Sequence, residues 1–228
     1  MRCLTFPLCL LALALSLRAQ DPVPKPDPAP KPTPKPEATE PREPTPIGLG
    51  ESLPKGLTLR AIDGTQHQLD DLKGKVVVFH FWSTTCPYEE AAEPKLNALA
   101  AEFAGQDVVV LGIAANAGEI GEQPKPEAFD TKEVADRPYG KLREKAKASQ
   151  VNHTILVDHG GDTLGKRLDG KTTPHCFVFD QEGKLRYSGA LDDDPHGEKE
   201  TPIRYVAGAV LALLEGKAPP LATTKPYG

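Results

Sequence analysis

The run Lys75 to Trp82, KVVVFHFW, restricts the fold of this 228-residue chain more than any other segment. A nearly continuous stretch of β-branched and aromatic residues is typical of a strand that is buried on both faces of a sheet. Cys86-Pro87 follows a few residues later, and apolar side chains then recur at helical spacing from Ala91 to Phe103. A doubly buried strand that leads into a helix indicates an α/β domain.

The rest of the chain continues to alternate between strand-like and helix-like segments. The turn dipeptide Asp63-Gly64 predicts an N-terminal β-hairpin, whereas a Gly/Pro-rich excursion from Ala115 to Pro138 carries no motif that we can interpret. The other expected elements are hairpin strands at Leu57–Arg60 and Gln66–Leu69, a second buried strand at Asp107–Ala114, a helix at Tyr139–Ser149, strands at Thr154–Val157, His175–Asp180 and Lys184–Gly189, and a closing amphipathic helix at Pro202–Leu214. This order predicts an α/β fold with a central mixed β-sheet, helices on both faces and an N-terminal β-hairpin.

The N-terminus has the layout of a secretory signal peptide. Arg2 precedes an apolar run from Leu4 to Leu17, and Ala19 supplies a small residue for cleavage. We therefore expect residues 1–20 to be removed and the protein to be exported, to a bacterial periplasm or cell envelope. The apolar run is shorter than the ~20 residues of a membrane helix, so no membrane span is expected after cleavage. An uncleaved anchor is the alternative.

Proline is concentrated directly after the expected signal peptide. Residues 21–46 read DPVPKPDPAPKPTPKPEATEPREPTP, in a chain of 24 prolines. A Pro/Lys/Glu-rich repeat of this kind cannot bury apolar surface and favours extended polyproline II, so we expect a disordered linker. Binding of envelope polymers through its lysines is the alternative. The folded domain is then expected over residues 47–216, followed by a C-terminal tail over 217–228.

The charge of the chain bears on its partners, and its cysteine content bears on its redox chemistry. The net charge of −5 is made of interleaved acidic and basic residues, which indicates neither a nucleic-acid nor a membrane-surface partner. Two of the four cysteines fall in the expected signal peptide, which leaves Cys86 and Cys176 in the mature chain. In an oxidising compartment two such cysteines form a disulfide, pair a reactive thiol with a buried one, or are both buried.

Cys86 stands at the junction of the expected buried strand and the following helix. Unpaired backbone N–H groups and the positive end of the helix dipole favour a thiolate at such a position. Pro87 occupies the first helical position, where proline is best tolerated. The sequence therefore predicts that Cys86 is a nucleophile, whatever its substrate is.

Several motifs together make the specific resemblance. Lys73-Gly74-Lys75 before VVVFHFW, the Cys86-Pro87 step, Thr173-Pro174 before a strand, and FVFDQEGKLRYSGALDD resemble the redoxin branch of the thioredoxin-like superfamily, of the AhpC-TSA type, over most of Leu53 to Gly216. The resemblance implies a thioredoxin-like fold in which Pro174 is a cis-proline beside Cys86. It also implies that the Thr173 backbone binds an extended substrate. Trp82 and Tyr88 are expected to frame the cysteine.

The chain departs from its relatives at the positions that matter for turnover. Dithiol oxidoreductases of this fold have a second cysteine three positions after the first, where this chain has Glu89. Some relatives have it three positions before, where this chain has Ser83. Cys86 therefore needs an external thiol to release a mixed disulfide. Ser83, Cys86, Pro87 and Glu89 match the peroxiredoxin pattern, but Phe79 replaces its proline, and its thiolate-stabilising arginine is missing near Pro174.

Histidines and the second cysteine allow both functional and structural interpretations. His80 occupies the position where thioredoxins bury a carboxylate, so it is expected either to act as a base or ion-pair partner of the thiolate, or to be a core histidine. Cys176 is expected to be a small buried side chain, with a role as a second thiol or a metal ligand as alternatives. His153, His159 and the acidic run Asp192–Asp194 with His196 are expected on the solvated surface.

These features predict an exported redoxin, which is an oxidoreductase. Its Cys86 is expected to carry out thiol-disulfide chemistry or antioxidant peroxide chemistry, and His80 or Glu89 is expected to move protons. Its partners are an external thiol reductant and a disulfide or peroxide substrate, and no cofactor or resident metal is expected. One alternative is a redox-inactive binding module that holds an extended peptide beside Pro174. A third is a Cu(I) carrier that uses Cys86, Cys176 and His175.

Overall fold

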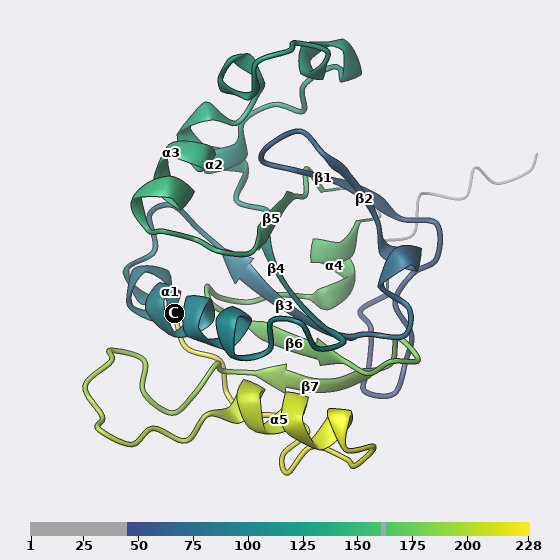
Figure 1. Ribbon diagram of the computed structural model, residues 1–228, viewed down its shortest axis with the longest axis vertical. Coiled ribbons are helices and arrows are strands. Elements are labelled where there is room, and N and C mark those ends of the chain that lie inside the picture. Colours follow the sequence, from purple (N-terminus) through teal and green to yellow (C-terminus); the bar gives the residue numbers. More distant parts are fainter. Residues whose placement is uncertain (1–44, 161–162) are drawn as a thin grey trace, which may run out of the picture. The chain divides into compact units, whose positions relative to one another are not determined.

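The computed structural model describes residues 45–160 and 163–228. Its described part contains a seven-stranded mixed sheet in the order β2-β1-β5-β4-β3-β6-β7 (Figure 1). β3 runs parallel to β4 and antiparallel to β6, so it lies inside the sheet. The strands are β1 (Thr58–Ala61), β2 (Gln66–Gln68), β3 (Val76–Trp82), β4 (Val108–Ala114), β5 (Thr154–Val157), β6 (Cys176–Phe179) and β7 (Leu185–Gly189).

Alternate residues of β3 divide the core between the two faces of the sheet. Val76 and Val78 pack with α1 (Pro87–Glu102) and α5 (Tyr205–Leu214). Phe79 packs on the other face with α4 (Leu164–Leu168). Two further helices are α2 (Ala117–Ile120) and α3 (Gly140–Ala148). Helices therefore cover both faces, and the α/β, thioredoxin-like prediction is confirmed.

Most of the expected strands and long helices are present, with boundaries shifted by a few residues. The hairpin around Asp63-Gly64 pairs β1 with β2 in antiparallel register. Two short helices, α2 and α4, were not expected from the sequence. Residues 1–44, which hold the expected signal peptide and nearly all of the expected linker, lie outside the described residues.

The segment expected to be a tail packs along β7 and ends beside α1 (Figure 1). The amide of Ser188 donates to the Ala222 carbonyl at 3.1 Å, and the amide of Thr224 donates to the Ser188 carbonyl at 3.2 Å. The Tyr227 hydroxyl donates to Asp192 at 2.9 Å. These contacts join residues 222–228 to the folded domain.

The acidic run Asp192–Asp194 was expected on the solvated surface, and for two of its residues this expectation is wrong. Asp192 and Asp194 are 3% and 4% exposed. Lys95 on α1 reaches both, with Nζ 2.9 Å from Asp192 Oδ2 and 3.8 Å from Asp194 Oδ2. Burial is tolerated because a lysine from a distant element compensates the two charges.

Candidate active site

Cys86 occupies the N-cap position of α1 and is partly exposed. Its amide donates to Ser83 Oγ at 3.1 Å, and its thiol donates to the carbonyl oxygen of Thr173 at 3.1 Å. Pro87 is the first residue of the helix. The site therefore joins the helix start, where the dipole favours a thiolate, to the loop before β6.

The loop before β6 carries the cis peptide bond Thr173–Pro174 that the resemblance implied. His175 holds this loop through both ring nitrogens: Nδ1 accepts from the amide of Lys171 at 3.3 Å, and Nε2 lies 3.1 Å from Ser188 Oγ. Because Nδ1 is an acceptor, Nε2 carries the proton and donates it to the serine. Burial lowers the pKa of His175 to about 4, so the ring is neutral at pH 7.

The loop between β3 and α1 is held by Glu119, a residue of the excursion in which the sequence shows no motif. Its carboxylate accepts from Ser83 Oγ at 2.6 Å, from the Thr84 amide at 2.6 Å, from Thr84 Oγ1 at 2.8 Å and from Thr85 Oγ1 at 2.9 Å. Burial alone raises the pKa of Glu119, but these hydrogen bonds outweigh burial and hold it below its ordinary value. No sequence signal points to Glu119, because it lies 34 to 36 positions from its partners.

Beneath the start of α1 lies a buried group of ionisable side chains. His80 is 0% and Glu89 is 1% exposed, and His80 Nδ1 lies 3.2 Å from Glu89 Oε1. On its other side His80 Nε2 lies 2.9 Å from His153 Nε2. Gly112 on β4 faces this ring: a Cβ there would lie 3.2 Å from His80 Nε2 and would overlap Ile155. A glycine at this register position leaves room for the imidazole.

His153 and His159 were expected on the solvated surface, and the structure corrects this for His153, whereas His159 is partly exposed in its loop. His153 contacts His80, and burial together with the charge of His80 lowers the pKa of His153 to about 3. The His159 Nε2 lies 2.8 Å from the Tyr139 hydroxyl, and burial lowers the pKa of this histidine. No local pattern signals these contacts, since each joins residues from different elements.

Trp82 and Tyr88 differ in their access to Cys86. Trp82 is 1% exposed, and its indole N–H donates to Glu93 Oε2 at 2.9 Å. The Trp82 side chain is thus buried below the loop, and the residue also lines the hollow beside Ser83 and Thr173. Tyr88 is partly exposed and lies with its ring centroid 5.3 Å from that of His196 and 6.3 Å from that of Tyr227.

Cys176 is paired with His80 across β3 and β6 and is fully buried. Both Cys86 and Cys176 are free thiols in the structure. Burial, with the nearby charges of Glu89 and Asp192, raises the pKa of the Cys176 thiol. Cys176 is therefore a protonated core side chain, and Cys86 is the accessible thiol of the pair.

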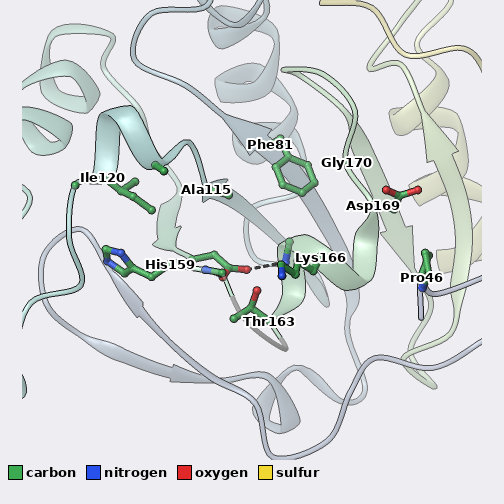
Figure 2. A pocket seen from close by; sticks show the side chains of 14 residues that line it. Pro46, Phe81, Ala115, Ile120, His159, Thr163, Lys166, Asp169 and Gly170 are labelled. Atoms are coloured by element: carbon green, nitrogen blue, oxygen red, sulfur yellow. Dashed lines mark hydrogen bonds between the residues drawn. The ribbon is translucent and has the colours of Figure 1, made fainter. Parts of the chain in front are cut away.

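Two hollows adjoin the site on the side of β3 and β4. One, of about 310 Å³, is lined by the loop residues Ser83 and Thr173. The other, of about 600 Å³, is lined by residues that include His159 and Lys166, as Figure 2 shows. Phe81 lines both hollows.

Within residues 45–160 and 163–228, no three His, Cys, Asp or Glu side chains are grouped so that they could hold a metal ion. None of the helices in the same ranges is both long and apolar enough to cross a membrane.

The sheet order, the cysteine at the start of α1 and the cis-proline beside it define a thioredoxin-like fold. Solved structures support this class: the chain superimposes on a protein of Sinorhizobium meliloti with a TM-score of 0.61 and 24% identity, covering 80% of this chain and 92% of that one. An uncharacterized conserved protein of Geobacillus kaustophilus gives the same TM-score and identity over 80% of this chain and 95% of its own. At this identity the likeness concerns the fold.

Residues 49–188 match the model of the AhpC/TSA family, so the chain belongs to that family. Among curated proteins it is 35% identical over 144 residues to the thiol-disulfide oxidoreductase ResA of Geobacillus thermodenitrificans, covering 63% of this chain and 70% of that protein. The ResA protein of Geobacillus kaustophilus matches with the same identity and coverage. The resemblance to AhpC-TSA-type redoxins is confirmed at the level of family.

Proposed function

We propose that this protein is an exported thiol-disulfide redoxin that uses Cys86 alone as its redox-active thiol. The observation that carries the proposal is the position of Cys86: a partly exposed thiol at the N-terminus of α1, 3.1 Å from the carbonyl of Thr173 in the cis-proline loop. The family and its relatives named thiol-disulfide oxidoreductases support the same chemistry.

The proposed reaction begins when Cys86 loses its proton and its thiolate attacks a substrate disulfide R–S–S–R′. The bond between Cys86 Sγ and one substrate sulfur forms as the substrate S–S bond breaks, and R′–S⁻ leaves and takes up a proton. The Thr173 backbone beside the thiol is suited to bind an extended substrate in this geometry. Residue 89 is a glutamate, so a second cysteine of the chain does not complete the reaction there.

The mixed disulfide is resolved by an external thiol in this proposal. Its thiolate attacks the substrate sulfur, forms R–S–S–R″ and releases the Cys86 thiolate, so electrons balance without another oxidant or reductant. Cys176 is a poor candidate for this attack because it is fully buried and its thiol pKa is raised. A low-molecular-weight thiol or a partner protein thiol is the expected reductant.

Replacement of Cys86 tests the proposal directly. Cys86→Ser is expected to abolish formation of a mixed disulfide with oxidised glutathione, because the oxygen nucleophile does not exchange with disulfides. Intact-mass measurement of the mature protein checks the adduct, and hydrogen peroxide in a parallel series tests for a sulfenic acid at the same thiol. Reaction with peroxide but with no disulfide would replace thiol-disulfide exchange by the peroxidase alternative.

Cys176→Ala is the matched control because it removes the other thiol of the mature chain. It is expected to form the Cys86 adduct at the wild-type rate. An adduct that persists in Cys86→Ser, or that disappears in Cys176→Ala, would show that the active thiol has been misassigned. A wild-type protein that forms no adduct under any condition would favour the peptide-binding alternative.

Export is part of the proposal and rests on residues 1–20, whose sequence has the layout of a signal peptide. The mature chain is expected to begin near Asp21 and to be found in the cell envelope or periplasm. Mass spectrometry of the protein recovered from envelope fractions measures the N-terminus. Recovery of the intact chain beginning at Met1 from the cytosol would contradict export.

A further inference from the structure

A continuous line of polar side chains runs from the surface to the buried end of α1. Its outer member is Asn152, whose amide and side-chain N–H groups donate to Asn97 Oδ1 at 3.1 Å and to the Asn97 carbonyl at 2.9 Å. Asn152 Oδ1 lies 3.4 Å from His153 Nδ1, and His153 Nε2 lies 2.9 Å from His80 Nε2. The line ends where His80 Nδ1 faces Glu89 at 3.2 Å.

The hydrogen bonds of this line determine where its protons are. The side-chain nitrogen of Asn152 already donates to Asn97, so its oxygen faces His153 and can only accept. His153 therefore carries a proton on Nδ1, and because its pKa is lowered to about 3 the ring is neutral and Nε2 accepts. The contact at 2.9 Å then requires that His80 Nε2 carry a proton and donate it.

This assignment leaves one proton for the space between His80 and Glu89. Among the described residues, His80 Nδ1 and both carboxylate oxygens of Glu89 have no aligned hydrogen bond. A carboxylate that is 1% exposed must be compensated by a charge or hold a proton. With Nε2 protonated, His80 is either an imidazolium facing a carboxylate or a neutral ring facing a carboxylic acid, and the pair is neutral in both cases.

We propose that His153 is a positioning residue: as acceptor to His80 Nε2–H it keeps the His80–Glu89 pair neutral with one shared proton, and this pair exchanges a proton with the Cys86 thiol. The inference rests on the proposed function of Cys86. Cys86 is the N-cap residue of α1 and Glu89 is the third residue of that helix, so the pair lies within the turn that begins at Cys86. The thiol donates to the Thr173 carbonyl in this structure, so the exchange requires it to turn from that carbonyl toward Glu89.

The proton balance of the step is simple. Glu89 takes the proton of the Cys86 thiol while His80 stays protonated, which leaves a thiolate next to a neutral carboxylic acid and an imidazolium. After the thiolate has attacked the substrate disulfide, Glu89 returns that proton to the leaving thiolate. If His153 instead donated to His80, the pair would carry one negative charge beside the thiol and would oppose thiolate formation.

Other ionisable groups around the pair come from three elements. Glu93 on α1 is 4% exposed, and burial raises its pKa despite the Trp82 hydrogen bond and the charge of His80. Lys145 on α3 acts on Glu93 from the outer side, and Cys176 on β6 is a protonated thiol. Of these side chains and His80, it is His80 that contacts Glu89, at 3.2 Å.

Two substitutions of His153 test whether it acts as a hydrogen-bond acceptor. They distinguish this role from that of a titrating group and from a merely structural role. His153→Leu removes the acceptor and is expected to move the midpoint of Cys86 alkylation upward by about one pH unit, an approximately tenfold loss of rate at pH 7. His153→Gln keeps an oxygen that accepts from His80 Nε2–H, so its pH profile is expected to match the wild type. Identical profiles for the two variants would overturn the proposal.

Nitrogen NMR of histidine-labelled Cys86→Ser protein tests the proton placement without any reaction at the thiol. The expected result is a neutral His153 with its proton on Nδ1 and a His80 whose Nε2 is protonated. A proton on His153 Nε2 would overturn the inference. This measurement does not use the chemistry of Cys86. An unreactive Cys86 would therefore contradict the proposed function, whereas the NMR result alone decides where the protons of His80 and His153 are.

Discussion

Lowering the pH from 6.5 to 4 is expected to destabilise the folded domain by about 3 kcal/mol through two buried histidines. Burial lowers the pKa of His153 to about 3 and that of His175 to about 4, against about 6.5 in the unfolded chain. The unfolded chain therefore binds these two protons at a pH where the native state does not. The stability that the neutral rings provide is complete above pH 6.5 and is lost as the pH falls.

The expected loss of stability is smaller than the full pKa shifts of the two histidines would give, because solvent screens part of the interaction that keeps His175 neutral. Glu93 acts in the opposite direction: its raised pKa means that the native state holds a proton that the unfolded chain releases above about pH 4.5, which favours folding at lower pH. Glu119 has a lowered pKa, so its contribution is lost below that range. Between pH 6.5 and 4.5 Glu93 therefore offsets part of the histidine effect, whereas Glu119 acts below this range.

Urea unfolding at a series of pH values measures the slope of stability against pH. The double variant His153→Gln with His175→Gln is the control, since glutamine keeps a hydrogen-bonding group at each position and does not titrate. The expected result is a steep loss in the wild-type protein and a much flatter one in the variant. Equal slopes in the two proteins would show that neither histidine is held neutral by the fold.

Gly170→Ala is expected to lower the unfolding free energy by about 2 kcal/mol, the usual cost of overpacking a core. A Cβ at this position would overlap the ring of Phe81, whose side chain is 9% exposed (Figure 2). Gly170 does not have a positive φ, so alanine is acceptable to its backbone and the effect is steric. For a domain of this size the midpoint of thermal unfolding is expected to fall by about 6 °C.

The same substitution is expected to slow disulfide exchange at Cys86, because Gly170 begins the loop that leads to Thr173. A double-mutant cycle with Phe81→Leu supplies the control: with the ring removed, Gly170→Ala is expected to cost less than half as much. Calorimetry and the glutathione adduct rate report the two effects. An equal cost in the wild-type and Phe81→Leu backgrounds would contradict a clash with this ring.

The parts of the site that local sequence dictates were predictable. The run before Trp82 requires a buried strand, and Cys86-Pro87 after it requires a helix start, because both signals act over a few residues. The family resemblance then implied the cis bond before Pro174, which the structure has. The AhpC/TSA match agrees with the class that these residues define.

The partners of these residues were not predictable, because each comes from a distant part of the chain. Glu119 lies in a segment without a motif, and His153 precedes a strand in what reads as a polar loop. Which loop residue meets His80 depends on the register of β4 against β5, where Gly112 leaves the necessary room. A sequence pattern specifies burial and periodicity, but side-chain contacts between elements are fixed only by packing.

The packing of residues 222–224 against β7 also has a consequence for self-association. An open strand edge offers unpaired N–H and C=O groups to other chains and so promotes aggregation. The outer edge of β7 is occupied at both ends, since Leu185 donates to the Glu51 carbonyl at 2.9 Å and Ser188 donates to the Ala222 carbonyl at 3.1 Å. The opposite edge, β2, is only three polar residues long. Concentrated solutions of the folded domain should therefore resist growth into extended intermolecular sheets.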